Sequence, residues 1–582
     1  MKNLLTLFSI IIILCTANVY SQWNNAEPNS LKKIDECLIK KGEIYFIFQI
    51  FNKNDLNRIT KIISIDNVKG YDVYAYANRN ELNEFDKLGY KFTILTHPGD
   101  MNPGQECSDN INEIMAWDTY PTYTAYLDMM NSFQTQFPNL VKIYTIGQSV
   151  NGKNIVYAKI TDSVNFRKPK PRFLYTSTMH GDELTAYVLM LRLIDTLVKG
   201  YGTVPQITNL VKNVEIWINP LANPDGTYGT GNTITSPTRY NANGKDLNRN
   251  FPDPVGGQNP TGAWQPETIA NMNLMTLNNY TLSMNFHGGA QVYNYPWDCK
   301  APYHPEDAWW IHLGRHWVDT VHSVNASYMV DVLGYPNIPG VTNGYAWYIV
   351  TGGRQDYMTY FKGGREVTLE ISSTKYPAGS QLPNYWNWNY RSFFNYINET
   401  LYGVRGIVSD SVTGAPIKSK IYVTQYSDTN WIFSDSVYGD YHRMLATGTY
   451  TFKVSAPGYV TKTIPNIYAK YDSTTRLNIQ LRPVGTSITN ENNLTDDYTL
   501  NQNYPNPFNP STFIDYYIPK ESFVTLKIYD NLGREVKTLV NTKLMPGNYQ
   551  IKWDAGKNNS GIYFYRLTAG EKTITRTMIL IK

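Results

Sequence analysis

Apolar positions along the chain follow two different patterns, which meet near residue 400. Between about 116 and 400, apolar runs of strand length alternate with longer stretches of helical periodicity. This alternation is typical of an α/β domain with a largely buried mixed sheet and helices on both faces. From 403 onward, short strands follow one another with turns between them, as in β-sandwiches. We therefore predict an α/β domain followed by two β-sandwich domains.

The first hundred residues contain an export signal and a small α/β unit. Lys2 precedes an apolar run over 4–14, the arrangement of a secretory signal peptide cleaved before Gln22. That run is too short to span a bilayer, and no later run reaches the length of a transmembrane helix. Strands at 43–50 and 71–78, with helices after each, predict a small α/β unit without a catalytic cluster. This unit is either a packing domain or a pro-segment that covers an active site.

The predicted organisation has six segments. They are a signal peptide (1–21), a pro-segment-like α/β unit (22–110), the α/β domain (116–400), a first β-sandwich (403–483), a polar linker (485–497) and a C-terminal β domain (498–582). A hydrophobic content of 42% and a net charge of only +4 favour globular domains that bind neither nucleic acid nor anionic membranes. Outside the signal peptide, Cys37, Cys107 and Cys299 allow at most one disulfide bond, whose partners the sequence does not identify.

Polar side chains stand at the ends of several apolar strands of the α/β domain. The run 173–179 ends at His180, and Glu183 opens the helix that follows. His287 ends another strand, and ligands in open α/β sheets collect at such strand ends. Two histidines and one glutamate are a recognised set of catalytic zinc ligands. Glu370 lies within the apolar strand 366–372, where a buried carboxylate beside a metal would serve as a general base.

Two further groups of polar residues have competing interpretations. Arg239 and Arg249 flank the loop 239–251, where one guanidinium could stabilise an oxyanion and the other could hold a carboxylate. The alternative is a surface turn with solvated charges. His312 and His316 are four residues apart on a predicted helix and could share a metal-binding face. They lack the intervening glutamate of a metalloprotease helix, which favours a helix surface or core edge.

Five motifs in order resemble those of the zinc metallocarboxypeptidases, in particular the regulatory branch with carboxypeptidases N, E, M and D. They are HGDE (180–183), NPDG (223–226), DLNRNFP (246–252), HGG (287–289) and TLEISSTKYP (368–377). The resemblance covers about 116–483, so that the first β-sandwich resembles the transthyretin-like domain of that branch. More weakly, residues 25–100 resemble bacterial carboxypeptidase pro-segments.

The resemblance implies one zinc ion per catalytic domain and a set of site residues. His180, Glu183 and His287 would bind zinc, Glu370 would be the general base and acid, and Arg239 would polarise the scissile carbonyl. Asn248 and Arg249 would bind the terminal carboxylate, and Tyr348 would be the mobile tyrosine that closes over it. Asp298 and Gln355 would line the side-chain pocket. This pocket would favour C-terminal Lys or Arg. Arg354 stands where the branch often has Met, and a second cation there could weaken that preference.

The C-terminal β domain resembles the sorting domain of the type IX secretion system. The matching stretches are LNQNYPNPFNPST, IYDNLGREVKTL and SGIYFYRLTAG, with a basic end at Lys582. The resemblance implies a type IX machinery as partner, export across the outer membrane, and a secreted or cell-surface-attached protein. The alternative is a generic β-sandwich adhesion module.

Three functions remain open from the sequence. The first is a secreted zinc carboxypeptidase that acts on peptide or protein C-termini and prefers Lys or Arg. The second is a zinc hydrolase of the same fold acting on cell-wall peptides or acyl-amino acids. The third is a non-catalytic surface-binding protein. Arg249 and Tyr348 favour a free carboxylate end and hence the first function, while intact metal ligands and Glu370 argue against the third.

Overall fold

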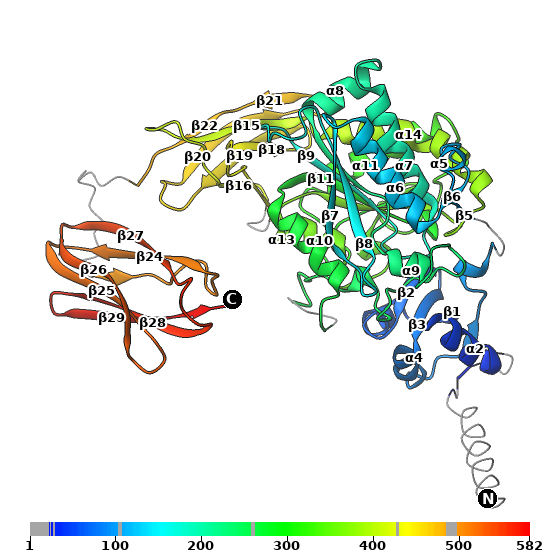
Figure 1. Cartoon of the computed structure of the whole chain (residues 1–582), viewed down its shortest axis with the longest axis horizontal. Helices are drawn as coiled ribbons and strands as arrows, with labels where there is room; N and C mark the ends of the chain where they lie inside the picture. Colours follow the sequence, from blue (N-terminus) through cyan, green and yellow to red (C-terminus); the bar gives the residue numbers. More distant parts are fainter. Residues whose placement is uncertain are drawn as a thin grey trace, which may run out of the picture. The chain divides into compact units, whose positions relative to one another are not determined.

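An eight-stranded mixed sheet forms the centre of the α/β domain (Figure 1). Its order is β13-β12-β14-β11-β9-β10-β8-β7. The strands are β7 (Val141–Gln148), β8 (Asn154–Ile160), β9 (Arg172–Ser177), β10 (Glu215–Asn219), β11 (Tyr280–His287), β12 (Ala290–Tyr295), β13 (Val341–Asn343) and β14 (Glu366–Ser372). The inner strands β10, β9, β11 and β14 pair in parallel, and their nearly continuous burial explains the apolar runs of the sequence.

The structure is a computed structural model that describes residues 23, 25–26, 30–102, 107–257, 262–426, 430–484 and 498–581. The predicted signal peptide, the polar linker and Lys582 lie outside these ranges. The chain divides into two compact units, 1–481 and 482–582, which are described separately. Within the described ranges, no helix combines the length and apolar character needed to cross a bilayer.

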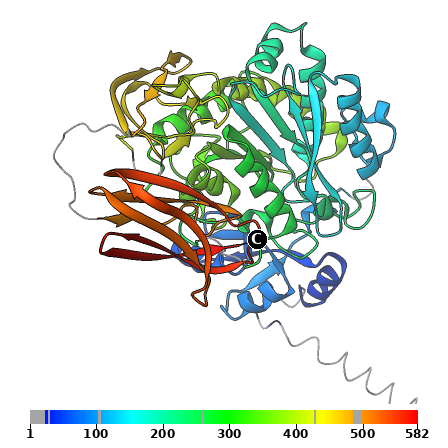
Figure 2. The ribbon, with the colours of Figure 1, turned by 60° about the vertical axis from the view of Figure 1, so that its left-hand side comes forward.

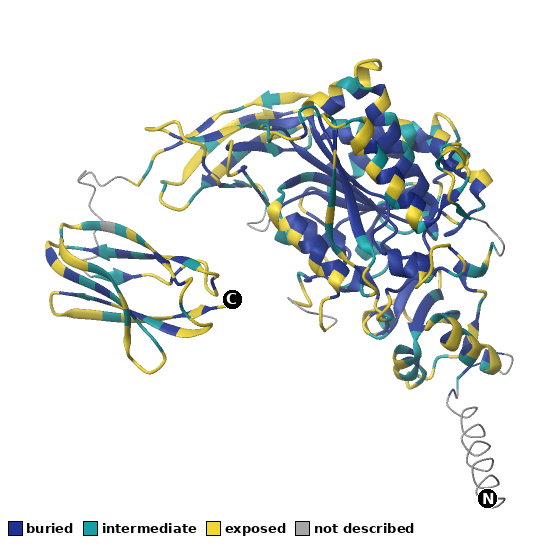
Figure 3. Ribbon diagram, viewed as in Figure 1, coloured by how far each residue is buried: buried dark blue, intermediate teal, exposed yellow. Residues whose placement is uncertain are grey.

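Helices cover both faces of the central sheet, as the sequence predicts. One face packs against the larger apolar core, to which α6 (Tyr123–Gln136), α7 (Thr185–Gly200), α8 (Pro205–Asn213), α11 (Asp307–His322) and α14 (Leu382–Glu399) contribute. The other face packs against a separate core formed with α10 (Pro266–Leu277) and α13 (Arg354–Phe361). Apart from the edge strand β7, the sheet is almost entirely buried, as is α7 (Figure 3). Apolar burial on both faces therefore fixes the strands whose ends carry the candidate site.

The N-terminal unit, residues 23–102, has its own apolar core and a four-stranded sheet of order β2-β3-β1-β4. Its strands and main helices are β1 (Glu43–Gln49), β2 (Ser64–Lys69), β3 (Asp72–Asn78), β4 (Phe92–Ile94), α2 (Leu31–Lys41) and α4 (Arg79–Asp86). The helix expected after β1 is shorter than the sequence suggests, with only a 3-10 turn (Lys53–Asp55) and α3 (Leu56–Ile59). The edge strand β2 contacts the α/β domain.

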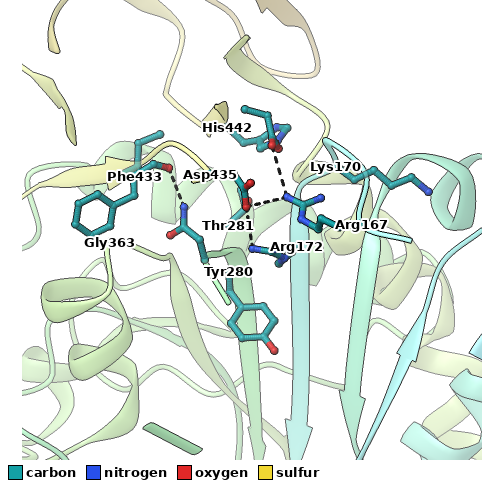
Figure 4. Close-up of a pocket in the computed structure, with 12 residues that line it drawn as sticks. Arg167, Lys170, Arg172, Tyr280, Thr281, Gly363, Phe433, Asp435 and His442 are labelled. Atoms are coloured by element: carbon teal, nitrogen blue, oxygen red, sulfur yellow. Dashed lines mark hydrogen bonds and ion pairs between the residues drawn. The ribbon is translucent and has the colours of Figure 1, made fainter. Parts of the chain in front are cut away.

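The first β-sandwich, residues 403–481, consists of two small sheets around a shared core. One contains β15 (Gly403–Asp410), β18 (Asp440–Arg443), β21 (Thr474–Arg476) and β22 (Ile479–Leu481), and the other β16 (Lys420–Val423), β17 (Trp431–Phe433), β19 (Gly448–Ser455) and β20 (Lys462–Ala469). Ion pairs join this domain to the α/β domain. In Figure 4, the Asp435 carboxylate lies 3.2 Å from Arg167 Nη2 and 3.3 Å from Arg172 Nη1.

A second, fully buried ion pair cluster joins the same two domains. Glu306, just before α11, lies 2.8 Å from Arg365 (Oε2–Nε) and also pairs with Arg443 of β18. Arg365 immediately precedes β14, the strand that carries Glu370. The first β-sandwich is therefore linked through charged side chains to a strand of the candidate site.

The second unit, residues 498–581, is a sandwich of two antiparallel sheets (Figure 2). The sheets contain β23 (Thr499–Leu500), β24 (Ser511–Ile518) and β27 (Gly547–Asp554), and β25 (Ser522–Tyr529), β26 (Glu535–Leu544), β28 (Gly561–Ala569) and β29 (Lys572–Leu580). In β25, Val524, Leu526 and Ile528 are buried while the residues between them are half-buried. The predicted alternation of this strand is confirmed.

Candidate metal centre and substrate site

The parallel pairing of β9, β11 and β14 gathers the predicted metal ligands at one edge of the sheet. His287 and Glu370 are direct register partners on β11 and β14. His180 and Glu183 lie on the turn that follows β9. A Cβ on Gly181 would lie 2.2 Å from the backbone of Gly226, so only glycine lets this turn pack so closely. The turn therefore holds the two side chains in place before α7 begins.

His180, Glu183 and His287 are buried and converge on one point. Their donor atoms lie within 4.8 Å of one another. The two imidazole Nδ1 atoms are 3.0 Å apart, and Glu183 lies 3.0 Å from His180 (Oε1–Nδ1) and 2.9 Å from His287 (Oε2–Nδ1). Lone pairs gathered so closely repel one another unless a proton or cation lies between them. The donor set and its convergence therefore fit a zinc ion.

The outer nitrogens of both imidazoles have polar partners that orient the rings. His180 Nε2 lies 3.0 Å from Asp246 Oδ1, and His287 Nε2 lies 2.7 Å from the amide of Asn285. Partners of this kind fix the rotation of a metal-binding histidine. The sequence analysis did not identify Asp246, although it begins the quoted DLNRNFP motif.

The protonation states of Glu183 and His287 suit metal binding, whereas the carboxylates of Glu183 and Asp246 raise the pKa of His180. Burial lowers the pKa of His287 to about 4, which leaves its imidazole neutral. Burial alone would raise the pKa of Glu183, but the adjacent His180, Lys375 and His287 hold it well below its usual range. Both residues thus offer lone pairs at neutral pH.

Glu370 has the surroundings of a proton-transfer group. Its side chain is buried at the floor of the site, and its Oε2 has no hydrogen-bond partner among the described residues. Burial, together with the neighbouring Glu183 carboxylate, raises the pKa of Glu370 well above its usual value. A carboxylate with a raised pKa accepts and returns protons near neutral pH.

Arg239, Asn248 and Arg249 lie on the loop that borders the metal-ligand group. Arg239 Nη1 is 3.3 Å from Glu183 Oε1, and its Nε is 3.1 Å from Asp246 Oδ2. Asp246 also accepts a hydrogen bond from the backbone N–H of Asn248 at 2.7 Å, which starts the 3-10 turn Leu247–Arg249. All three predicted residues are buried and line one cavity together with Tyr348, which follows α12 (Gly344–Trp347). The loop is thus part of the site rather than a solvated surface turn.

The predicted side-chain pocket contains a buried carboxylate. Asp298 Oδ1 accepts hydrogen bonds from Gln355 Nε2 at 3.0 Å and from Asn294 Nδ2 at 3.1 Å. A Cβ on Gly344 would lie 1.6 Å from Asp298 Oδ1, so this glycine makes room for the carboxylate. Burial and the nearby Asp356 carboxylate raise the pKa of Asp298 well above its usual range.

Arg354 does not act as a second free cation beside this pocket, contrary to the concern raised by the sequence. Its guanidinium is fully buried, pairs with Glu366 at 3.0 Å (Nη2–Oε2) and donates to Thr176. Because Glu366 neutralises it, Arg354 adds no net positive charge near Asp298.

Strand β2 of the N-terminal unit fills the part of the cavity lined by Arg239, Arg249 and Tyr348, a contact not predicted from the sequence. Asp66 Oδ1 lies 2.6 Å from Lys375 Nζ and 3.2 Å from Arg239 Nη1. Arg249 Nη2 donates to the carbonyl of Ile65 at 2.9 Å, and the Tyr348 hydroxyl to the carbonyl of Asp66 at 3.3 Å.

Other contacts of the N-terminal unit seat it beside the same loop. Glu43 accepts hydrogen bonds from the backbone N–H groups of Arg239 and Tyr240 at 2.6 and 3.0 Å. Ser64 contacts both Asp246 and Arg239. The cavity left among the site residues has a volume of only about 20 Å³, room for a single water molecule.

The remaining sequence candidates lie elsewhere. Cys37, Cys107 and Cys299 are all unpaired thiols. His312 and His316 are half-buried on α11, and His316 forms a separate group with Glu399 and Asp472. Lys375, whose Nζ lies 2.6 Å from Glu183 Oε1, belongs to the site but was not singled out, because a lysine in a strand-end loop has no distinctive pattern.

Comparisons with known proteins match three parts of the chain to known families. Residues 126–392 match the zinc carboxypeptidase family, 403–482 the carboxypeptidase regulatory-like domain, and 502–582 the secretion system C-terminal sorting domain. The match to a solved structure, thrombin activatable fibrinolysis inhibitor, has 16% identity and a TM-score of 0.46, covering 61% of this chain and 98% of that one.

Curated relatives are carboxypeptidases. Human carboxypeptidase D is 36% identical over 377 residues, which cover 62% of this chain but only 27% of that protein. Mouse carboxypeptidase M is 35% identical over 357 residues, 58% of this chain and 79% of that protein. Carboxypeptidase E of Caenorhabditis elegans is 31% identical, with 59% and 82% covered. Because the matches cover most of the length of carboxypeptidases M and E at 35% and 31% identity, the chain belongs to the zinc carboxypeptidase family.

Proposed function

We propose that the protein is an exported zinc-dependent carboxypeptidase that hydrolyses the C-terminal peptide bond of peptides and proteins. The observation that carries this proposal is the shared cavity lined by the metal-ligand group on one side and by Arg249 and Tyr348 on the other. Zinc held by His180, Glu183 and His287 would acidify a water molecule and polarise a carbonyl group. A buried guanidinium beside that centre selects a substrate that brings its own carboxylate.

The chain's own residues have separate roles in this proposal. Glu370 takes a proton from the attacking water and passes it to the leaving amine, as its raised pKa allows. Arg239 donates hydrogen bonds to the oxygen of the scissile carbonyl as it gains negative charge. Asn248, Arg249 and Tyr348 hold the terminal carboxylate and thereby place the last peptide bond beside Glu370.

Asp298 supports a preference for C-terminal Lys or Arg. Its carboxylate is buried at the wall of the same cavity, and the Arg354 charge is already neutralised by Glu366. A basic side chain entering the pocket would pair with Asp298 and satisfy a carboxylate that is costly to bury alone. Gln355 and Asn294 hold the carboxylate in position.

We also propose that the N-terminal unit is a pro-segment that keeps the enzyme latent. Three of the residues assigned to substrate, Arg239, Arg249 and Tyr348, donate their hydrogen bonds to β2 instead. A substrate has to displace Asp66 and Ile65 before its own carboxylate and carbonyl can bind. Activity of the intact chain should therefore be low until the unit is removed or loosened.

The sorting domain supports export through a type IX machinery to the cell surface or the medium. Fractionation of cells that express the intact chain, or the chain cut after residue 484, tests this step. Retention of the truncated protein inside the cell is the expected result, and equal export of both would contradict the assignment.

Hydrolysis of blocked dipeptides that end in Arg, Lys, Phe or Glu tests the activity. We expect release of the last residue, fastest for Arg and Lys, and loss of activity on chelation that added zinc restores. Chelated and zinc-loaded protein with equal rates would exclude a zinc mechanism. Equal rates on free and amidated C-termini would instead point to a zinc hydrolase with another substrate, such as a cell-wall peptide.

A further inference from the structure

A second group of metal-ligating side chains lies where the α/β domain meets the first β-sandwich. His316 comes from α11, Glu399 is the last residue of α14, and Asp472 lies in the turn between β20 and β21. Their donor atoms lie within 4.8 Å of one another. Figure 1 labels the four elements that carry or flank these residues. The group therefore joins two helices of one domain to a turn of the other.

The turn that carries Asp472 is held firmly against the α/β domain. The Tyr471 ring stacks on the imidazole of His312, with centroids 3.7 Å apart and planes at 19°. The Tyr471 hydroxyl donates to the carbonyl of Ala308 on α11 at 3.4 Å, and the Thr474 hydroxyl donates to the carbonyl of Leu401, just after α14, at 2.7 Å. Asp472 is thus presented to His316 and Glu399 by contacts that do not involve its own carboxylate.

The charges around the group favour a cation. Glu399 is only 5% exposed, and its carboxylate lies 3.1 Å from His316 (Oε1–Nδ1). The carboxylates of Asp472 and Asp319 line the adjoining hollow, which also contains the single positive charge of Arg315. Carboxylates brought together near a buried one repel each other unless a cation neutralises them.

His312 supplies an independent indication that a ligand belongs here. It precedes His316 by one helical turn, its ring centroid is 6.4 Å away, and both line the hollow of about 430 Å³. The Nε2 atom of His312 is buried and has no hydrogen-bond partner among the described residues. A buried ring nitrogen without a partner is costly, and a metal ion or a water bound to one would satisfy it.

We propose that His316, Glu399 and Asp472 form a structural site for a divalent transition metal, with zinc as the best-matched ion. One imidazole and two carboxylates are a donor set that such ions accept, and water completes the coordination. Ligands of tetrahedral zinc lie roughly 3.4 Å apart, so a modest rotation of the exposed Asp472 side chain closes the set. The metal would fasten the first β-sandwich to α11 and α14.

This site is separate from the proposed catalytic centre and does not depend on the proposed activity.

The test counts metal in the full chain. In the His180→Ala/His287→Ala variant, calorimetric titration should still detect one tightly bound Zn²⁺ per chain. Bound Zn²⁺ should also raise the midpoint of thermal unfolding of this variant. Adding His316→Ala should weaken this binding by more than roughly 100-fold, beyond the 10- to 100-fold typical of losing an outer partner. Asp472→Asn should weaken it less. His322→Ala, on the same helix but outside the group, is the matched control and should leave it unchanged.

A second measurement tests the proposal even if the double variant folds poorly. The otherwise unaltered chain should carry two Zn²⁺ per molecule by elemental analysis, and His316→Ala should carry one without losing peptidase activity. One equivalent in both proteins would overturn the proposal, as would unweakened binding after His316→Ala in the double variant.

Discussion

The carboxylate of Asp66 and the ammonium of Lys375 lie 2.6 Å apart (Oδ1–Nζ), and the same ammonium lies 2.6 Å from Glu183 Oε1. A residue of the N-terminal unit therefore shares a buried cation with a residue of the metal-ligand group. Both partners are at most 4% exposed, so water screens this contact little. This contact links the proposed latent state to the proposed metal centre.

Replacing Asp66 with Ala should activate the intact chain. The substitution removes the carboxylate that binds Arg239 and Lys375, and hydrogen bonds to charged groups contribute about 1.5–3 kcal/mol each. We expect kcat/KM of the intact chain to rise roughly 10- to 100-fold, measured on a blocked peptide ending in Arg. Asp72→Ala is the control, because Asp72 contacts Gln49 within the N-terminal unit. Unchanged activity in Asp66→Ala would show that β2 does not limit access.

Replacing Arg249 with Gln should remove the preference for free chain ends. The guanidinium would no longer bind the terminal carboxylate, a loss of roughly 2–4 kcal/mol for a buried charged partner. In the Asp66→Ala background, we expect kcat/KM for free-ended peptides to fall roughly 30- to 1,000-fold, with little change for the amidated peptide. An equal fall for both substrates would mean that Arg249 only supports the fold.

Replacing Asp298 with Asn should change specificity more than rate. The amide keeps the shape of the pocket but cannot pair with a basic side chain. We expect the ratio of kcat/KM for Arg over Phe substrates to fall at least tenfold, or about 1.4 kcal/mol. Asp331→Asn, a surface control, should leave the ratio unchanged. A uniform loss on all substrates would place Asp298 outside the specificity pocket.

Replacing Glu370 with Gln should abolish proton transfer while preserving the fold. General acid–base groups contribute about 10²–10⁴-fold, so kcat should fall by that factor. Because the pKa of Glu370 is raised, the unaltered enzyme should lose activity as the pH falls through a value above the usual 4.5. A pH–rate profile of kcat measures this limb. A flat profile down to pH 4.5 would exclude Glu370 as the base.

The contact between the N-terminal unit and the α/β domain should weaken with rising pH. Glu81 accepts a hydrogen bond from the Tyr240 hydroxyl at 2.8 Å, and burial raises its pKa from 4.5 to about 7. A raised carboxyl pKa contributes stability that is present below 4.5 and is lost as the pH rises through 7. Compared with Glu81→Gln, the unaltered chain should therefore lose thermal stability between pH 5 and 8. Parallel curves for both proteins would contradict this.

The sequence predicts the metal-ligand group because its members stand at a strand end or in the turn just after it. His180 and His287 terminate apolar runs, and parallel strands bring their ends together regardless of the 106 residues between them in the chain. The α/β domain and the β-rich regions follow from the same periodicities. Local pattern also placed Glu370, since a lone carboxylate in a buried strand needs a polar site beside it.

Contacts between side chains of distant segments could not be predicted. Asp66 lies in an ordinary edge strand, and nothing near it indicates that it meets Arg239. The sequence suggests that Arg354 is a free cation, because its ion pair with Glu366 forms only in the folded protein. The helix expected after β1 is confirmed only in part, because a 3-10 turn takes up its start and α3 ends at Ile59. Tertiary packing determines these features, and no short sequence pattern indicates which side chains pair.

The charge cluster around Glu306 makes the first β-sandwich inseparable from the α/β domain that carries the candidate site. A chain ending after Thr400 would keep Arg365 but lose Arg443, leaving Glu306 with half of its countercharge inside the protein. Losing one partner of a buried ion pair typically costs about 3–5 kcal/mol. Gene fusion or recombination that separated these two domains would unbalance Glu306, so the α/β domain and the first β-sandwich should be inherited together as one piece.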